Sequence, residues 1–90
     1  MSGNNSDIIE VHEGDWGRQE WASKARRLIK RELKYNEITY EELARRLQDM
    51  GIKENAHSIA MKIGRGMYPT WFFLAAMRAI GCRHMKFEDL

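Results

Sequence analysis

The most informative segment of the chain reads TYEELARRL at positions 39–47. Glu42 follows Thr39 by three residues, the capping-box spacing in which each side chain bonds the other residue's free backbone amide, so a helix is expected to start here. The apolar residues of this segment have helical spacing and would form its buried face: Leu43, Ala44 and Leu47. Gly51 can adopt a positive φ and is expected to end the helix.

A second informative segment reads KIGRGMYPT at positions 62–70. The residues before it predict a helix from Glu54 or Asn55 to Ile63, with four apolar residues on its inward side: Ala56, Ile59, Ala60 and Ile63. Gly64 and Gly66 flank Arg65 and are expected to stop this helix in a turn where the backbone can approach another molecule closely. Pro69 suits the first turn of a further helix that would reach about Ile80.

An amphipathic and strongly basic helix is expected upstream, from Trp16 to about Asn36. Its apolar stripe consists of Trp21, Ala25, Leu28, Ile29 and Leu33. Residues 18–34 hold seven basic and two acidic side chains, a net charge of +5, whereas residues 1–15 have a net charge of −4. The opposite face of this helix is therefore cationic, which suits a polyanionic partner or simply a solvated surface.

The segments before and after these helices are less regular. Residues 1–15 are interpreted as a flexible or covering N-terminal segment, in which Ile8, Ile9 and Val11 could form a short strand. Residues 84–89 alternate Met85 and Phe87 with polar residues, which also permits a short terminal strand. Residues 16–90 would then form a single all-α domain of four to five helices.

Several classes of protein are disfavoured by composition. Cys82 is the single cysteine, so an intrachain disulfide cannot form, and residues 1–15 lack the basic start of a signal peptide. No run approaches the ~20 apolar residues of a membrane span, so we expect a cytoplasmic protein with no membrane partner. Cys82 and His84 lack the second pair of ligands that a structural zinc site needs, and no catalytic or phosphate-loop pattern is present. We therefore expect no enzyme activity, metal, cofactor or small-molecule ligand.

With the closing Ile80-Gly81, the two informative segments resemble the lambda-repressor-like, or Xre-type, helix-turn-helix family. That family combines a T-x-E-E-L-A helix start with an I-x-R-G-x-x-P-(S/T) turn, and the resemblance covers about residues 38–90. The chain also resembles a bacterial group catalogued as a domain of unknown function, in which a Trp and a basic helix precede Y-x-E-L-A and K-I-x-R-G. Two departures are a connection about six residues longer between Leu47 and Arg65, and apolar residues at Phe72 and Ala76 where relatives are usually polar.

The resemblance implies sequence-specific binding to double-stranded DNA, as a nucleoid-associated regulator of transcription. A recognition helix fits the major groove and reads base edges with outward polar side chains, which here would be Asn55, His57, Ser58, Met61 and Lys62. Phosphates would be bound at the start of the second helix, in the later turn and by the basic helix, through Thr39, Tyr40, Arg65, Tyr68, Arg27 and Lys30. The simpler alternative is that these are ordinary surface polar residues.

A different function class is a protein-interaction module that uses the apolar helix 70–80 without binding DNA. Nine of the ten residues from Trp71 to Ile80 are apolar, more than one small core normally covers, so a homodimer is expected. Its interface would consist of Trp71, Phe72, Ala76 and Phe87. The rival hypothesis is that Ile8, Ile9, Val11 and Trp16 of the same chain cover this apolar surface.

Overall fold

The computed structural model describes residues 11–90, with the side chains of residues 11–16 and of Asp89 left out of the description. It contains α1 (Val11–Tyr35), α2 (Tyr40–Asp49), α3 (Ala56–Arg65), α4 (Thr70–Ile80) and a short 3-10 helix at Phe87–Asp89. The expected all-α class is confirmed. No strand forms in the described part of the chain: residues 11–13 belong to α1, and residues 84–89 contain the 3-10 helix instead of the terminal strand that their alternation permitted.

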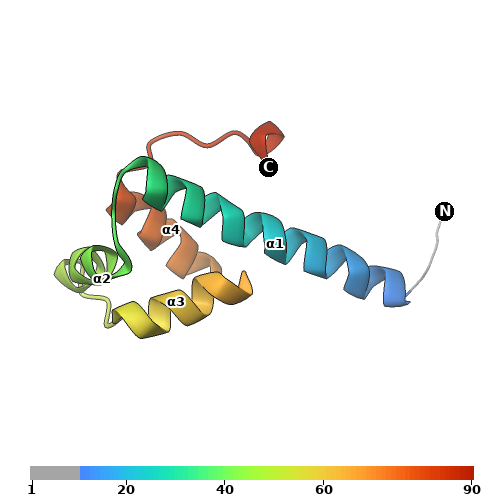
Figure 1. Cartoon of the computed structure of the whole chain (residues 1–90), viewed down its shortest axis with the longest axis horizontal. Helices are drawn as coiled ribbons and strands as arrows, with labels where there is room; N and C mark the ends of the chain where they lie inside the picture. Colours follow the sequence, from blue (N-terminus) through green and yellow to red (C-terminus); the bar gives the residue numbers. More distant parts are fainter. Residues whose placement is uncertain (1–10) are drawn as a thin grey trace.

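The long helix α1 organises the molecule. It begins at Val11, five residues before the expected start, and its apolar stripe buries Leu28, Ile29 and Leu33. Figure 1 shows α1 running along the length of the molecule, with its first turns extending beyond the other helices and the C-terminal residues lying beside it. The helix that carries the cationic face is therefore held to the core by apolar residues of its second half.

The helix α2 starts as its sequence predicts, with Thr39 as the N-cap. The Thr39 Oγ1 accepts a hydrogen bond from the Glu42 amide at 3.1 Å. The Glu42 carboxylate, however, accepts bonds from Arg45 and Arg46 at 2.5 and 2.8 Å, and these two guanidinium groups lower the pKa of Glu42 to about 2. Gly51 takes a φ of +86° where the chain leaves the helix, as expected.

The helix α3 starts with a complete capping box, because Asn55 accepts a bond from the Ser58 amide and Ser58 accepts one from the Asn55 amide. The expected end at Ile63 is wrong by two residues, since α3 continues through Arg65 and is ended by Gly66, the second of the two glycines expected to stop it, which has a φ of +67°. A Cβ atom added at Gly66 would lie 2.0 Å from the carbonyl oxygen of Ala22. The backbone of this turn was expected to approach another molecule closely, but at Gly66 it approaches α1 of the same chain.

The helix α4 closes the core. It packs against α1 and α2, while α3 also packs against both α1 and α2. Its buried residues are Phe72, Ala76, Met77 and Ile80. Trp71 and Leu74 stay 52% and 61% exposed, so α4 keeps a solvent side despite its apolar composition. No helix in the described residues is long and apolar enough to cross a membrane.

Candidate nucleic-acid interface

The outer face of α1 carries four exposed cations, Arg27, Lys30, Arg31 and Lys34. Among the described residues, no carboxylate forms an ion pair with any of them. Because exposed cations that form no ion pair remain available to phosphate, this face is the best candidate for contact with a polyanion. We call these four residues the cationic row.

The cationic row leads to the start of α2. Lys30 and Lys34 line an open hollow of about 300 Å³ together with Thr39 and Tyr40. The structure thus gathers three of the predicted phosphate ligands, Lys30, Thr39 and Tyr40, around one hollow. Arg27 lies on α1 nearby in sequence, where its guanidinium donates to the Ser23 hydroxyl at 2.9 Å. Free amides at a helix N-terminus add a further attraction for anions.

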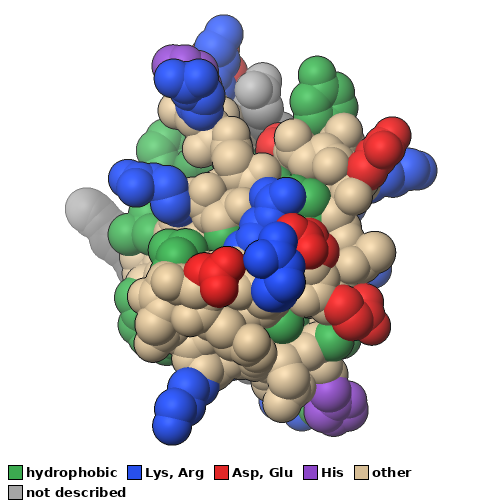
Figure 2. Space-filling model, turned by 90° about the vertical axis from the view of Figure 1, so that its left-hand side faces the viewer, with side chains coloured by type: hydrophobic (Ala, Val, Ile, Leu, Met, Phe, Trp, Pro, Cys, Tyr) green, Lys and Arg blue, Asp and Glu red, His purple; other side chains and the backbone are tan. Residues whose placement is uncertain are grey.

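The opposite situation holds along α2, where the charges pair with one another. Arg45 contacts Glu42 and Asp49, and Arg46 contacts Glu42 and donates to the Ala79 carbonyl at 2.9 Å. Figure 2 shows the end of the molecule where α2 lies, with basic side chains at the centre flanked by acidic ones. This end is close to charge-balanced and offers a polyanion little net attraction.

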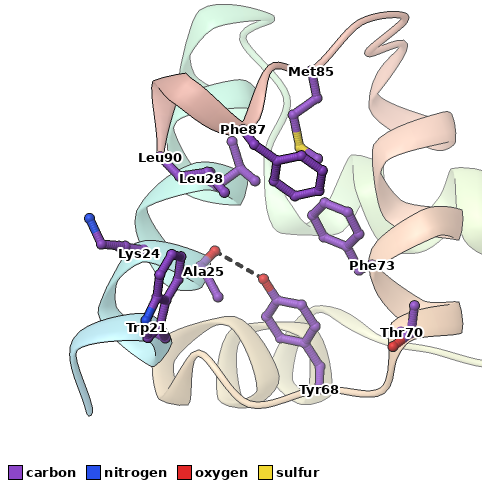
Figure 3. A pocket seen from close by; sticks show the side chains of 10 residues that line it. All are labelled: Trp21, Lys24, Ala25, Leu28, Tyr68, Thr70, Phe73, Met85, Phe87 and Leu90. Atoms are coloured by element: carbon purple, nitrogen blue, oxygen red, sulfur yellow. Dashed lines mark hydrogen bonds between the residues drawn. The ribbon is translucent and has the colours of Figure 1, made fainter. Parts of the chain in front are cut away.

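The two remaining predicted phosphate ligands, Arg65 and Tyr68, lie outside the cationic row and the hollow beside it. Arg65 is exposed in the last turn of α3. Tyr68 is half-buried, and its hydroxyl donates its proton to the Ala25 carbonyl of α1 at 2.9 Å (Figure 3). Burial also raises the pKa of Tyr68, so the phenol stays protonated at neutral pH. Tyr68 therefore joins the α3–α4 turn to α1 instead of offering its proton to a phosphate.

A Tyr68→Phe variant is expected to lose about 1 kcal/mol of unfolding free energy, because the Ala25 carbonyl would keep only its bond within α1. Urea denaturation followed by circular dichroism measures this loss. Duplex affinity should stay unchanged in the same variant, whereas a large drop in affinity at full stability would show that the hydroxyl contacts phosphate.

The predicted base-reading residues divide into two groups. His57 and Met61 are exposed on the outer face of α3, and Asn55 is also exposed and uses only its side-chain oxygen as the N-cap. Ser58 and Lys62, in contrast, contact Glu54 of their own chain. Only the first group is free to contact a base without giving up a bond.

Glu54 is a residue that sequence reasoning missed. Its side chain is 3% exposed, and it accepts a bond from the Ser58 hydroxyl at 2.7 Å and an ion pair from Lys62, whose ammonium lies 5.0 Å from the centre of the Phe72 ring. Gln48 of α2 donates to the Glu54 carbonyl at 2.7 Å. The spacing of Glu54, Ser58 and Lys62 at four-residue steps was a signal for this shared face, since residues four apart are neighbours on a helix.

The expected dimer interface is only partly exposed. Phe72 and Ala76 are fully buried in the core of a single chain, so placing them in an interface was wrong: they face α1 and α2 rather than solvent. Trp71 is 52% and Phe87 79% exposed. The hypothesis that Ile8, Ile9, Val11 and Trp16 cover this surface concerns side chains outside the described residues.

The described residues contain no group of three or more His, Cys, Asp or Glu side chains that could hold a metal ion. The Cys82 thiol donates a hydrogen bond to the backbone carbonyl oxygen of His84 at 3.3 Å.

Comparison with known proteins gives one match. Residues 21–85 match the model of a family described as a domain of unknown function, DUF6471. No curated protein and no solved structure matches the chain. The matched range runs from Trp21 on α1, through the cationic row and α2 to α4, to Met85 in the tail, and thus covers the arrangement described above. The chain belongs to the DUF6471 family.

Proposed function

We propose that this protein binds double-stranded DNA without enzymatic activity and regulates transcription. The observation that carries the proposal is the cationic row on α1, which has no carboxylate partners among the described residues and leads to the N-terminus of α2. Phosphate contacts supply most of the affinity of such proteins, and four to six of them are within the capacity of this surface with Thr39, Tyr40 and Arg65.

The order of α2, a connection and α3 is the order of a helix-turn-helix, in which the second helix enters the major groove. The exposed residues of α3 then become the base readers of this proposal: Asn55, His57 and Met61. We assign Ser58 and Lys62 a smaller part in readout, because contact with a base would require them to leave Glu54.

Salt dependence tests the proposal. Duplex affinity measured by fluorescence anisotropy should fall with a slope of log K against log salt of about −4 to −5, which corresponds to four to six phosphates. The Lys30→Ala/Lys34→Ala variant should reduce the steepness of this slope by about 2 units. It should weaken binding to a duplex of random sequence and to a duplex selected for tight binding about equally.

The matched control is Arg78→Ala/Lys86→Ala, which removes the same charge from exposed positions on α4 and in the C-terminal tail. This control should retain most of the affinity. A slope near zero for the wild type, or equal losses in the two double variants, would contradict a binding surface at the cationic row.

A protein-interaction module is the second candidate function, favoured by the exposed Trp71 and Leu74 on α4. A chain that shows no salt-sensitive binding to any duplex, while Trp71→Ala abolishes capture by a purified partner protein, would support this candidate.

A further inference from the structure

An apolar groove of about 290 Å³ lies between α1, α4 and the C-terminal residues. Its side chains include Trp21, Phe73, Met85 and Phe87, of which Trp21 is 59% and Phe87 79% exposed. Figure 3 shows Phe73, Met85 and Phe87 gathered at one end of the groove and Trp21 with Tyr68 toward the other. The volume is at or below the ~300 Å³ lower end of small-molecule sites, and it suits two or three apolar side chains of a peptide.

The rim of the groove is basic. The Lys24 ammonium lies 5.4 Å from the centre of the Trp21 ring. Lys24, Arg27 and Arg31 line a smaller hollow of about 90 Å³ that shares Leu28 and Leu90 with the groove. Among the described residues that line the two hollows, all the charged side chains are basic. An apolar floor with a basic rim favours a segment that contains both apolar and acidic residues.

The chain contains such a segment at its own N-terminus, where positions 7–11 read DIIEV. Ile8, Ile9 and Val11 supply apolar side chains, and Asp7 and Glu10 supply the acidic ones. Residues 1–15 have a net charge of −4 and contain no lysine or arginine, so nothing in this segment repels the rim.

The geometry of α1 limits how far this segment can reach along the groove of its own chain. Val11 is the first residue of a continuous helix, and ten residues of helix separate it from Trp21 by about 15 Å. Ile8 precedes Val11 by three residues, which span at most about 11 Å when extended. Even fully extended back along α1, a chain leaving Val11 stops about 4 Å short of the level of Trp21 at Ile8, so this segment of the same chain cannot extend along the groove to Phe87.

A second molecule has no such restriction, because the first turns of α1 extend beyond the other helices (Figure 1). We propose that residues 7–11 of one copy dock in the groove of a second copy. In a two-fold symmetric pair the exchange is reciprocal, so two segments and two grooves are buried together. The groove shares no lining residue with the hollow at the start of α2, although its rim includes Arg27 and Arg31 of the cationic row. The exchange goes beyond the proposed function and does not depend on it.

Sedimentation equilibrium of the full chain from 1 to 200 μM tests the exchange. A monomer–dimer equilibrium is expected. Ile8→Ser/Ile9→Ser and Phe87→Ser should each weaken dimerisation at least tenfold, and the high exposure of Phe87 keeps the monomer folded, as circular dichroism will show. Leu74→Ser is the matched control, because Leu74 is 61% exposed on α4 and does not line the groove, and dimerisation should be unchanged.

A charge exchange tests the register. Glu10→Lys and Lys24→Glu should each weaken dimerisation several-fold, and the two changes combined should restore it toward the wild-type value, since the proposed attraction between the acidic segment and the basic rim is re-formed in the opposite sense. A monomer at every concentration would overturn the proposal. A Leu74→Ser variant that dimerises as weakly as Phe87→Ser would also overturn it, because the contact would then lie on α4. A combined charge variant that dimerises no better than either single charge variant would overturn it as well.

Discussion

A Gly66→Ala variant is expected to lose about 4 kcal/mol of unfolding free energy. Gly66 has a φ of +67°, a left-handed conformation that costs an L residue about 1–2 kcal/mol. The added Cβ would also lie 2.0 Å from the Ala22 carbonyl oxygen and 2.7 Å from its carbon. Because both are backbone atoms inside α1, relief requires α1 and α3 to separate, and that exposes the core between them.

Gly51→Ala is the matched control for this prediction. Gly51 has a φ of +86°, so its replacement carries the same backbone penalty, but nothing lies within 4 Å of an added Cβ. We expect a loss of about 1–2 kcal/mol in this variant. The midpoints of urea denaturation, followed by circular dichroism, measure both losses. Equal losses in the two variants would contradict the contact between Gly66 and α1.

The starts of α2 and α3 could be predicted from the sequence because capping is local, whereas α1 begins five residues before its expected start. Thr39 with Glu42 indicated α2, and Asn55 was one of two expected starts for α3. The end of α3 could not be predicted in the same way, since Gly64 and Gly66 look equivalent in a sequence. Only the packing against Ala22 distinguishes them: Gly66 is pressed against α1, whereas an added Cβ at Gly64 meets nothing within 4 Å.

The buried face of α4 could not be predicted from the sequence either. A helix that is apolar nearly all round carries no pattern that separates the core side from the solvent side. Phe72 and Ala76 turn toward α1 and α2, whereas Trp71 and Leu74 turn away from them. The basic face of α1 was easier to predict, because seven cations among residues 18–34 cannot all be buried in so small a domain.

The buried side chain of Glu54 changes the interpretation of two predicted base-reading residues, Ser58 and Lys62. Ser58 and Lys62 have outward spacing relative to Ile59 and Ile63, so the sequence favours both as contacts for a ligand. Glu54 comes just before the helix and gives no sign of being buried. Once its side chain is removed from water, it needs both a hydroxyl and a cation, and Ser58 and Lys62 supply them.

A Lys62→Met variant is expected to lose about 2–3 kcal/mol of unfolding free energy. Methionine retains the packing of the long side chain on Phe72 but leaves the Glu54 carboxylate buried without a cation. Breaking a fully buried pair costs about 3–5 kcal/mol, and we expect less because the Lys62 side chain is 32% exposed. The double variant Glu54→Gln/Lys62→Met removes the buried charge as well and should recover at least half of the loss, as measured by thermal and urea denaturation.

The same variants separate a structural lysine from a base reader. If Lys62 serves mainly to neutralise Glu54, the folded Lys62→Met protein should bind selected and random duplexes with nearly the same ratio of affinities as the wild type. His57→Ala is the comparison, because His57 is exposed on the outer face of α3 and has no such partner to satisfy. The opposite outcome is a loss of about 1–3 kcal/mol of binding free energy in Lys62→Met that affects only the selected duplex and is not restored in the double variant. It would identify Lys62 as a base contact that leaves Glu54 on binding.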